Sequence, residues 1–327
     1  MFVPHTFALA LFMTVLSTTC WGSFANTYKL TKNYRFELYY WDYAFGIFLI
    51  SVILAFTLGS IYGGASSFLP NLHSAAPINL FYAMVAGFLF NIANFLLIAG
   101  IEMVGLAIAF PTSIGIALVE GVVLSYAIQP KGNTSLLALG VASAVLAVIL
   151  IGKAYGARAG ANRATSSRKG VVVCIVSGLL MGTFAPFVTR AMTAAQPLTP
   201  YTVAVFFTLG SLVCCFPFNM ILMKWPLVGQ PIGLGEYFRA SAYYHFLGLL
   251  GGAIWGLGTV SNFVAAGFVG VAISYAIGQA SPMVATLWGV LVWHEFRNAG
   301  GRSKGYLAGM VFFYLLALVL IAMAIKS

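Results

Sequence analysis

The stretch "KAYGARAGANRATSSRK", residues 153–169, is the only conspicuously basic, Gly/Ser/Ala-rich segment of an otherwise apolar chain. Of the 327 residues, 61% are hydrophobic and 7% charged, whereas soluble proteins are about 45–50% apolar and about 25% charged. Hydrophobic stretches of about 20 residues, long enough to cross a bilayer, lie five before this segment and five after it. The sequence therefore predicts an all-α integral membrane protein with a central linker.

The ten expected spans share this length and apolar character. They are 7–29, 41–62, 79–101, 104–128, 135–153, 170–192, 201–225, 242–266, 269–293 and 304–325. The first differs from a signal peptide because it has no positively charged start. The four cysteines fall inside spans without the spacing of metal ligands, so we expect buried free thiols and no metal site.

The net charge of +10 is distributed unevenly over the loops. Only Lys131, Arg190 and Lys326 lie in the even-numbered connections or at the termini. The other basic residues lie in or beside the odd-numbered connections: Lys29, Lys32, Arg35, Lys153, Arg158, Arg163, Arg168, Lys169, Lys224, Arg239, Arg297, Arg302 and Lys304. By the positive-inside rule both termini lie outside the cytoplasm, in a multi-pass protein of the plasma membrane. The charge thus indicates topology and not nucleic-acid binding.

The two sets of five spans resemble each other. A shift of 165 positions brings Gly105 onto Gly270 and "GLAIAF" (105–110) onto "GVAISY" (270–275). Separately, near the front of each half, "WGSF" (21–24) answers "MGTF" (181–184). An odd number of spans per copy makes the second copy enter the membrane from the opposite side. We therefore expect ten transmembrane helices as two inverted five-helix repeats: residues 1–153, a cytoplasmic linker 154–169, and residues 170–327. Inverted repeats are typical of transporters.

The chain resembles the ureide permease-like branch of the drug/metabolite transporter superfamily. The residues that carry the resemblance are "CWGSFANTYKL" (20–30), "YWDYAFG" (40–46), "AFTLGSI" (55–61), "GFLFNIANFLLIAGIEMVGLAIA" (87–109) and "GQASPMVATLWGVLVWHEFR" (278–297). The resemblance implies a proton-coupled importer of small, neutral, polar compounds; relatives handle ureides and nucleobases, and neighbouring branches carry sugars. The linker has no phosphate-binding motif, so no nucleotide cofactor is expected.

Glu120 is the only acid that these boundaries place well inside a span, since Asp42 and the other acids fall near span ends or in loops. A charge at such a position costs about 3 kcal/mol or more, and a proton relay uses a protonatable group of this kind. We expect Glu120 to couple transport to H⁺. The alternative is a structural glutamate, held neutral by a neighbour or reaching toward the membrane surface.

Neutral polar residues offer a substrate site. Asn91 and Asn94 are three residues apart and share one helical face; amides supply both donors and acceptors. In the second half the corresponding face carries Trp255, Thr259 and Asn262. An aromatic ring beside hydroxyls and amides suits a flat heterocycle or a sugar, although helix-to-helix hydrogen bonding is the usual alternative.

Proline should break spans four and nine, at Pro111 and Pro282, because it cannot donate a helical hydrogen bond. Broken helices are tolerated where the freed backbone is buried or lines a cavity. We expect polar neighbours of these breaks to line the substrate path, the alternative being a plain packing kink. They are Thr112, Ser274, Gln279 and Ser281; Trp21, Asn26 and Trp288 are further candidates, because their places do not fit an interfacial aromatic belt or a loop.

Two other functions compete with uptake of a small polar solute. Export of lipophilic cations would use Glu120 as an unpaired membrane carboxylate, with aromatic walls. An intramembrane enzyme would need paired acids, a histidine metal motif or a nucleophile elbow, and no span carries one. The glycine pairs Gly178/Gly182 and Gly252/Gly256 fit close helix packing and no chemistry.

Overall fold

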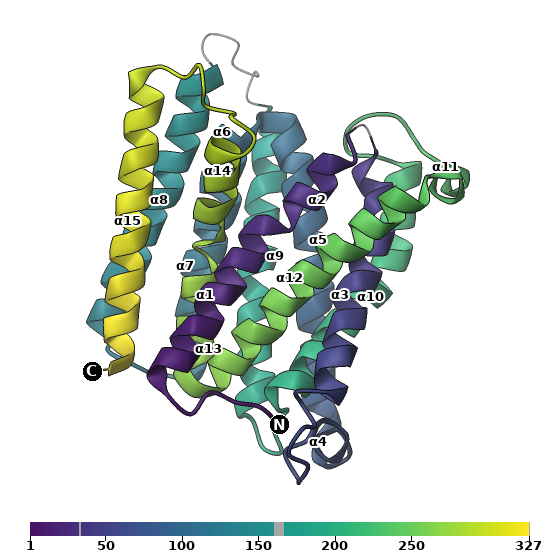
Figure 1. Ribbon diagram of the computed structural model, residues 1–327, viewed down its shortest axis with the longest axis vertical. Helices are drawn as coiled ribbons and strands as arrows, with labels where there is room; N and C mark the ends of the chain where they lie inside the picture. The colour runs from purple at the N-terminus through teal and green to yellow at the C-terminus, as the bar shows by residue number, and fades with distance from the viewer. Residues whose placement is uncertain (33, 160–166, 327) are drawn as a thin grey trace. The chain divides into compact units, whose positions relative to one another are not determined.

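The computed structural model describes residues 1–32, 34–159 and 167–326, and within them the chain is helical and has no β-strand (Figure 1). Part of the predicted linker 154–169, residues 160–166, lies outside the described residues. The helices are α1 (Phe7–Ser23), α2 (Ala25–Leu30), α3 (Phe36–Phe56), α4 (Phe68–Ser74), α5 (Pro77–Val104), α6 (Leu106–Ala109), a π-helical segment (Phe110–Ile114), α7 (Gly115–Ile128), α8 (Thr134–Ala159), α9 (Arg168–Thr193), α10 (Pro200–Lys224), α11 (Leu234–Arg239), α12 (Ala242–Val269), α13 (Val271–Gly278), α14 (Ser281–Leu291) and α15 (Gly301–Lys326).

Nine helical stretches among the described residues are long and apolar enough to cross a membrane. The prediction of an all-α membrane protein is therefore confirmed. The remaining expected span, 269–293, consists of α13 and α14, with Gln279 and Ala280 between them. The break has a simple cause: Pro282 has no N–H to donate to the Gly278 carbonyl, where α13 ends. The full set of ten spans and their inverted repeat stay predictions, with which these helices are compatible.

Polar side chains fix where several helices begin. The Thr6 hydroxyl accepts from the Leu9 N–H at 3.3 Å, just before α1. The Asn133 Oδ1 accepts from the Leu136 N–H at 3.1 Å, just before α8. Such N-caps satisfy backbone donors that the first helical turn leaves without a partner, and they allow apolar segments to begin at defined residues.

The helix bounds follow the spacing that relates the two halves of the sequence. Adding 165 to the bounds of α5, residues 77 and 104, gives 242 and 269, the bounds of α12. The residue after each of these helices is a glycine with positive φ, +73° at Gly105 and +92° at Gly270. Both helices thus end at the same kind of left-handed turn, and a shorter helix follows each turn.

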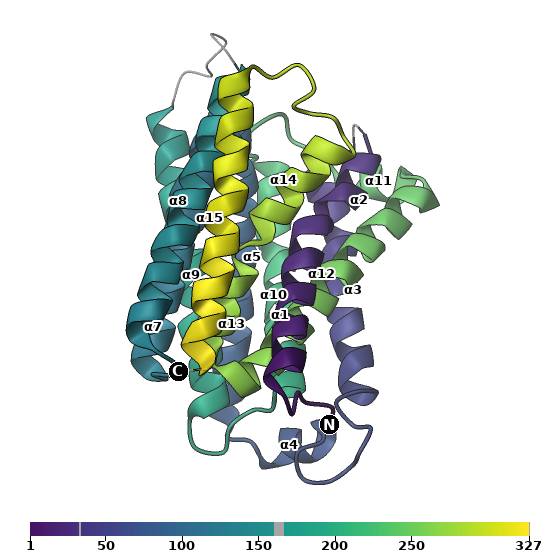
Figure 2. The same cartoon turned by 60° about the vertical axis from the view of Figure 1, so that its left-hand side comes forward.

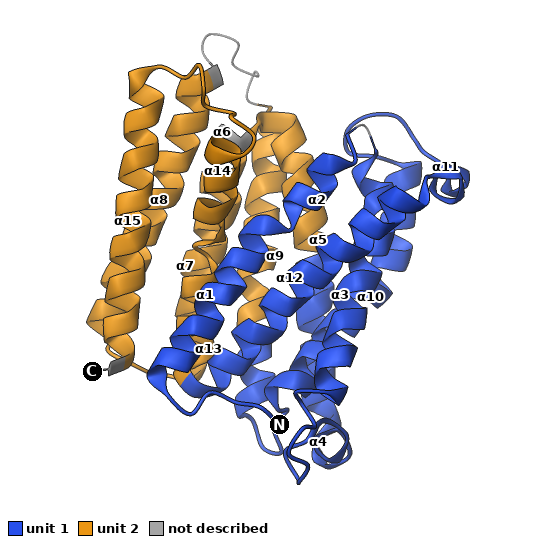
Figure 3. Cartoon of the chain, viewed as in Figure 1, with its two compact units in different colours: residues 1–91, 187–268 blue, residues 92–186, 269–327 orange. Residues whose placement is uncertain are grey.

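The described chain forms two compact units, and neither coincides with one half of the sequence. Unit 1 comprises Met1–Asn91 and Phe187–Phe268, and unit 2 comprises Ile92–Pro186 and Val269–Ser327. The boundaries run through α5 and α9 and near the end of α12, as the change of colour in Figure 3 shows. Each unit therefore takes helices from both halves. The division into residues 1–153 and 170–327 remains a prediction about duplication.

Glycines set the close packing within unit 1. A Cβ on Gly256 would lie 3.0 Å from the Ile47 carbonyl oxygen, and one on Gly252 would collide with the backbone at Tyr43. The predicted packing role of this glycine pair is confirmed, because it lets α12 lie directly against α3. α5 and α10 approach each other in the same way, at Gly87 and Gly210.

Unit 2 is built around two helix pairs. α8 and α15 run side by side in both views (Figures 1 and 2), and α13 packs on α7. The Tyr275 hydroxyl, fully enclosed, donates to the carbonyls of Ala117 and Met181 at 3.2 Å each. These bonds fasten the first part of the broken span to α7 and α9.

Candidate functional site

An aromatic stack lies within unit 1, built from α1, α5 and α12. The Trp255 ring stacks on Phe90 with a centroid distance of 4.5 Å and an interplanar angle of 25°. It also stacks on Trp21, at 5.7 Å and 16°. Phe207 of α10 lies 5.5 Å from Phe90. Trp255 is buried and Trp21 only partly so, so a flat aromatic wall forms with one ring at its more accessible end.

Neutral hydrogen-bonding groups edge this wall. The Trp21 Nε1–H donates to the Thr259 hydroxyl at 3.1 Å. Next to Phe90, the fully buried Asn91 accepts from the Ser211 hydroxyl at 3.3 Å through its Oδ1. Its Nδ2 lies near the Cys214 thiol, a weak acceptor, and has no hydrogen-bond partner within the described residues. The helix that carries Phe90 therefore also carries a buried amide donor with spare capacity.

The other predicted residues of unit 1 lie near this cluster in sequence but differ in their contacts. Asn262 is buried three residues after Thr259, on the same face of α12. Asn26 is partly exposed, and its Nδ2 donates to the Ser23 carbonyl at 2.8 Å, a bond within the α1–α2 turn. The structure thus brings Trp21, Trp255 and Thr259 into contact and uses Asn26 locally.

Glu120 lies in unit 2, on α7, in a groove of about 550 Å³ whose other lining residues include Pro111, Ile116 and Val145. Its Oε1 accepts from the Thr183 hydroxyl at 2.9 Å. Its Oε2 has no hydrogen-bond partner within the described part of the chain. α9 approaches closely here, because a Cβ on Gly182 would lie 2.8 Å from that oxygen. The carboxyl therefore sits in apolar surroundings with half of its acceptors free.

The polar residues of the broken ninth span are also in unit 2. Ser274 is fully buried and its hydroxyl donates to the Val271 carbonyl at 3.2 Å, within α13. Gln279 is 6% exposed and lies at the break. Ser281 is partly buried and begins α14. At the break, the Gln279 amide and the Ser281 hydroxyl thus lie beside backbone that is not part of a regular helix.

The remaining predicted residues of unit 2 are spread over three elements. Thr112 lies partly buried in the π-helical segment, directly after Pro111, so the expected distortion of the fourth span is observed. Asn94 is 8% exposed on α5. Trp288, on α14, is 37% exposed. They do not form one cluster with Glu120 in the contacts described.

Several groups in these sites were missed from the sequence. Thr183 belongs to "MGTF", a motif that indicated the internal repeat and gave no sign of contact with Glu120. The larger omission is Asp42, which the sequence placed at a span end. α3 begins at Phe36, not at 41, so Asp42 lies well inside the helix, where Tyr237 and His245 hold its carboxylate. Glu120 is therefore not the only acid within a membrane-spanning helix.

The "WHEFR" segment has an electrostatic role within unit 2. The Glu295 Oε2 lies 3.2 Å from the Arg158 Nη1, at the end of α8. The guanidinium also lies over the Phe296 ring, 5.1 Å from its centroid. This motif fastens the loop after α14 to α8 and contributes nothing to the clusters above.

The fold and these groups define a class. The chain is a multi-pass α-helical membrane protein, and its membrane-spanning helices bury neutral amides, hydroxyls and aromatic rings. Among the described residues no group of three or more His, Cys, Asp or Glu side chains is placed to hold a metal ion. A buried set of uncharged hydrogen-bonding groups is what a solute carrier needs.

Comparison with known proteins gives the family. A sequence model described as "Ureide permease" matches residues 156–325, just over half of the chain. The chain belongs to the ureide permease family. The resemblance seen in its motifs is thereby confirmed.

Curated relatives extend over almost the whole chain. Ureide permease 1 of Arabidopsis thaliana is 22% identical, over 86% of this chain and 87% of its own length. Ureide permease 4 of the same plant is 21% identical and covers 98% of both chains. A probable glucose uptake protein, GlcU of Staphylococcus aureus, is 33% identical over 28% of this chain and 33% of its own. The protein is accordingly a transporter of small solutes.

A solved structure shares the fold. It superposes with a TM-score of 0.65 at 16% sequence identity and covers 95% of this chain and 98% of its own. At that identity the likeness concerns the arrangement of helices alone.

Proposed function

We propose that this permease imports a small, neutral, polar solute, such as a ureide, a nucleobase or a sugar, by proton symport with alternating access. In this proposal it resides in the plasma membrane with both termini outside. The observation that carries it is the wall of Phe90, Trp255 and Trp21, edged by Thr259 and Asn91. Every group named there is uncharged at neutral pH.

Chemistry supports a neutral, flat or ring-shaped ligand. Aromatic faces pack against planar rings and against the apolar faces of sugars. The free donor of Asn91 can bind a carbonyl oxygen. A buried amide without its partner costs about 1–3 kcal/mol, and a ligand carbonyl would remove that cost. The names of the relatives, ureide permeases and a probable glucose uptake protein, agree with such ligands.

Proton coupling is assigned to Glu120. Its surroundings favour exchange of one proton, because the carboxyl lies in an apolar groove, has one hydrogen-bond donor in Thr183 and leaves Oε2 free. Loss of a proton there leaves a charge with little compensation, which a conformational change can relieve. That dependence is what a symporter needs.

Alternating access is supported by the correspondence between halves. α5 and α12 have bounds 165 residues apart, and each is followed by a glycine with positive φ and a helix that is soon interrupted. Duplicated sets of helices with broken members are a common basis for exposing one site to either face. The interrupted helices carry Thr112 and Gln279, which we assign to the substrate path.

The experiment is a ligand screen on the purified full-length protein. Thermal unfolding is measured with ureides, nucleobases, sugars and quaternary amines in separate arms, since a ligand that binds the folded state raises its apparent stability. One neutral class should raise the unfolding temperature, and Asn91→Ala should abolish the rise. A response to quaternary amines alone would contradict the proposal and favour export of lipophilic cations.

A further inference from the structure

A second protonatable cluster lies in unit 1, where three helices meet around Asp42. The Tyr237 hydroxyl, on α11, donates to Asp42 Oδ1 at 2.8 Å. His245 Nδ1, on α12, lies 2.7 Å from Asp42 Oδ2. The Tyr237 and His245 rings meet edge to face at 4.6 Å. Both carboxylate oxygens are therefore held, each by a different helix.

The Asp42 and His245 side chains differ in how far they are buried. The Asp42 side chain is 9% exposed, whereas that of His245 is 25% exposed. α12 passes very close to the acid, because a Cβ on Gly248 would lie 2.5 Å from the Asp42 Cβ. The carboxylate is thus enclosed, and the imidazole is the member of the pair with access to water.

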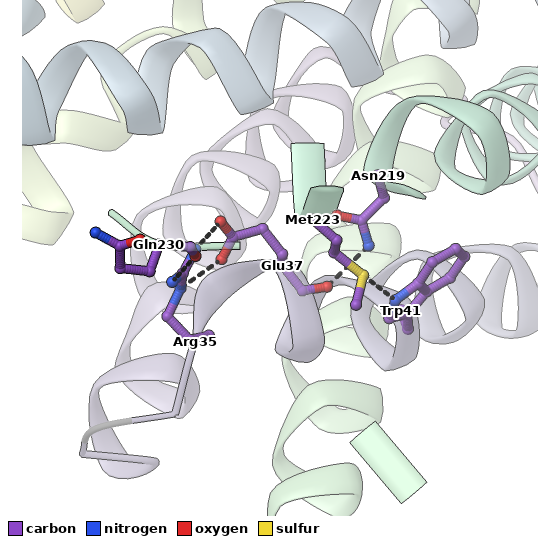
Figure 4. A network of polar contacts seen from close by, with 6 residues as sticks. All are labelled: Arg35, Glu37, Trp41, Asn219, Met223 and Gln230. Carbon is purple, nitrogen blue, oxygen red and sulfur yellow. Dashed lines mark hydrogen bonds and ion pairs between the residues drawn. The ribbon is translucent and has the colours of Figure 1, made fainter. Parts of the chain in front are cut away.

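Two charged residues at the start of α3 lie near this cluster in the sequence. Arg35 and Glu37, at the start of α3, pair with each other, with the Arg35 Nε–H donating to Glu37 Oε2 at 3.0 Å (Figure 4). Arg35 also donates to the Gln230 carbonyl at 2.9 Å, and the Asn219 amide donates to the Glu37 carbonyl at 2.8 Å. These bonds fix the beginning of α3 and leave His245 as the basic side chain paired with Asp42.

The other groups facing Asp42 are tyrosines. Tyr34 and Tyr39 interact with it electrostatically. Burial, and then the Asp42 charge, raise the pKa of Tyr34 to about 12. Burial, and then the hydrogen bond to Asp42, also raise the pKa of Tyr237. Both therefore stay neutral between pH 5 and 8, and Tyr237 stays a donor. On α11, Glu236 and Arg239 are 3.9 Å apart and largely exposed.

Sequence neighbours of Tyr237 and His245 line a small pocket. A pocket of about 250 Å³ is lined by residues around the start of α3, by α11 and by the start of α12, among them Tyr34, Arg239 and Tyr244. Tyr244 directly precedes His245.

We propose that Asp42, His245 and Tyr237 form a proton-binding site, separate from Glu120, through which pH controls transport. The ionised Asp42 carboxylate can only accept, so the His245 Nδ1 carries its hydrogen toward it. When the site takes up a proton, one N–H bond forms at His245 Nε2. The proton comes from hydronium, whose O–H bond breaks to leave water. The pair changes from net −1 to net zero, and the imidazolium remains paired with Asp42.

This assignment goes beyond the coupling role of Glu120 and can hold or fail separately. Tyr237 connects the protonation of this site to the conformation of the chain. Its hydrogen bond joins the short helix α11, none of whose residues is buried, to Asp42 inside α3. Gain of a proton at His245 weakens the pull of Asp42 on the Tyr237 hydroxyl. The loop between α10 and α12 is thereby made sensitive to pH.

Proton binding can be measured directly because the chain has four histidines. The full-length protein, labelled at histidine, is titrated by NMR, and His245→Gln assigns the resonance by its loss. In Asp42→Asn the resonance should move at a lower pH, since an opposite charge favours imidazolium. The resonances of the exposed His5 and His73 serve as the internal control. An unshifted His245 resonance in a folded Asp42→Asn protein overturns the proposal.

Tyr237→Phe gives an independent variant if Asp42→Asn does not fold. Loss of its hydrogen bond leaves more negative charge on Asp42, so the His245 resonance should move at higher pH than in the wild type, by a smaller amount. Movement at the wild-type pH would contradict the site.

Uptake into proteoliposomes at equal pH on both sides tests the consequence for transport. Between about pH 5 and 8, where histidine changes charge, the wild-type rate should vary with pH. Asp42→Asn and His245→Gln should lose the part of that variation that falls in the histidine range. Solute exchange by the Glu120→Gln protein should keep that part. A Glu120→Gln protein that loses it instead would assign the pH dependence to Glu120 and overturn the proposed control by this cluster.

Discussion

Glu120 is the residue whose replacement separates binding from coupling. Glu120→Gln keeps the size of the side chain and its acceptor for the Thr183 hydroxyl but removes the exchangeable charge. We expect binding and solute exchange to survive in proteoliposomes, while accumulation driven by a pH gradient disappears. Glu120→Asp keeps the charge but shortens the reach, so a weaker activity with a shifted pH profile is expected.

Thr183→Val is the matched control for this prediction. It removes the hydrogen bond to Glu120 Oε1 and leaves the carboxyl itself, so gradient-driven accumulation should be reduced and not lost. If Glu120→Gln concentrates the solute as steeply as the wild type, Glu120 is structural, and coupling belongs to another group.

Single residues show where sequence reasoning reaches its limit. Glu120 was identifiable because one acid interrupts a long apolar run. Its bond to Thr183 was not, since the partners are 63 positions apart and meet only when α7 packs on α9. Asp42 was misplaced because the first turn of α3 carries Glu37, whose charge lowers the local hydropathy; its pairing with Arg35 lets the helix begin earlier.

At the scale of the helix, Gly270 ends α12 with φ +92° and ψ 151°. Such a conformation costs a residue with a side chain about 1–3 kcal/mol, and a new Cβ would also lie 3.2 Å from the Lys131 side chain. Gly270→Ala should therefore lower the thermal unfolding temperature of the purified protein. Gly115→Ala is the control, because Gly115 is helical and a Cβ there meets nothing within 4 Å.

An equal loss of stability in both glycine variants would show that the turn after α12 is not special.

The sequence predicted the positions of the helices well, since length and hydropathy decide which segments can span. It also located two interruptions, from Pro111 and Pro282. It did not locate the turns at Gly105 and Gly270, because a glycine in an apolar run does not reveal the sign of its φ.

At the scale of the molecule, the distribution of basic residues predicts the orientation in the membrane. A reporter active only in the cytoplasm should be active within the 153–169 segment and inactive when fused to either terminus. The measurement is reporter activity relative to the amount of fusion protein. A fully active fusion at the C-terminus would refute the orientation and the charge argument behind it.

The interleaving of the two units bears on how the protein is made. When synthesis has reached Pro186, unit 1 still lacks Phe187–Phe268 and unit 2 lacks Val269–Ser327. Trp21 cannot form its hydrogen bond until Thr259 has been synthesised, and Asn79 cannot bind the Ala195 carbonyl until Ala195 has been. The earliest helices therefore stay in the bilayer without their final neighbours until most of the chain has left the ribosome. Two separately expressed halves would have to exchange helices with each other before either unit could form.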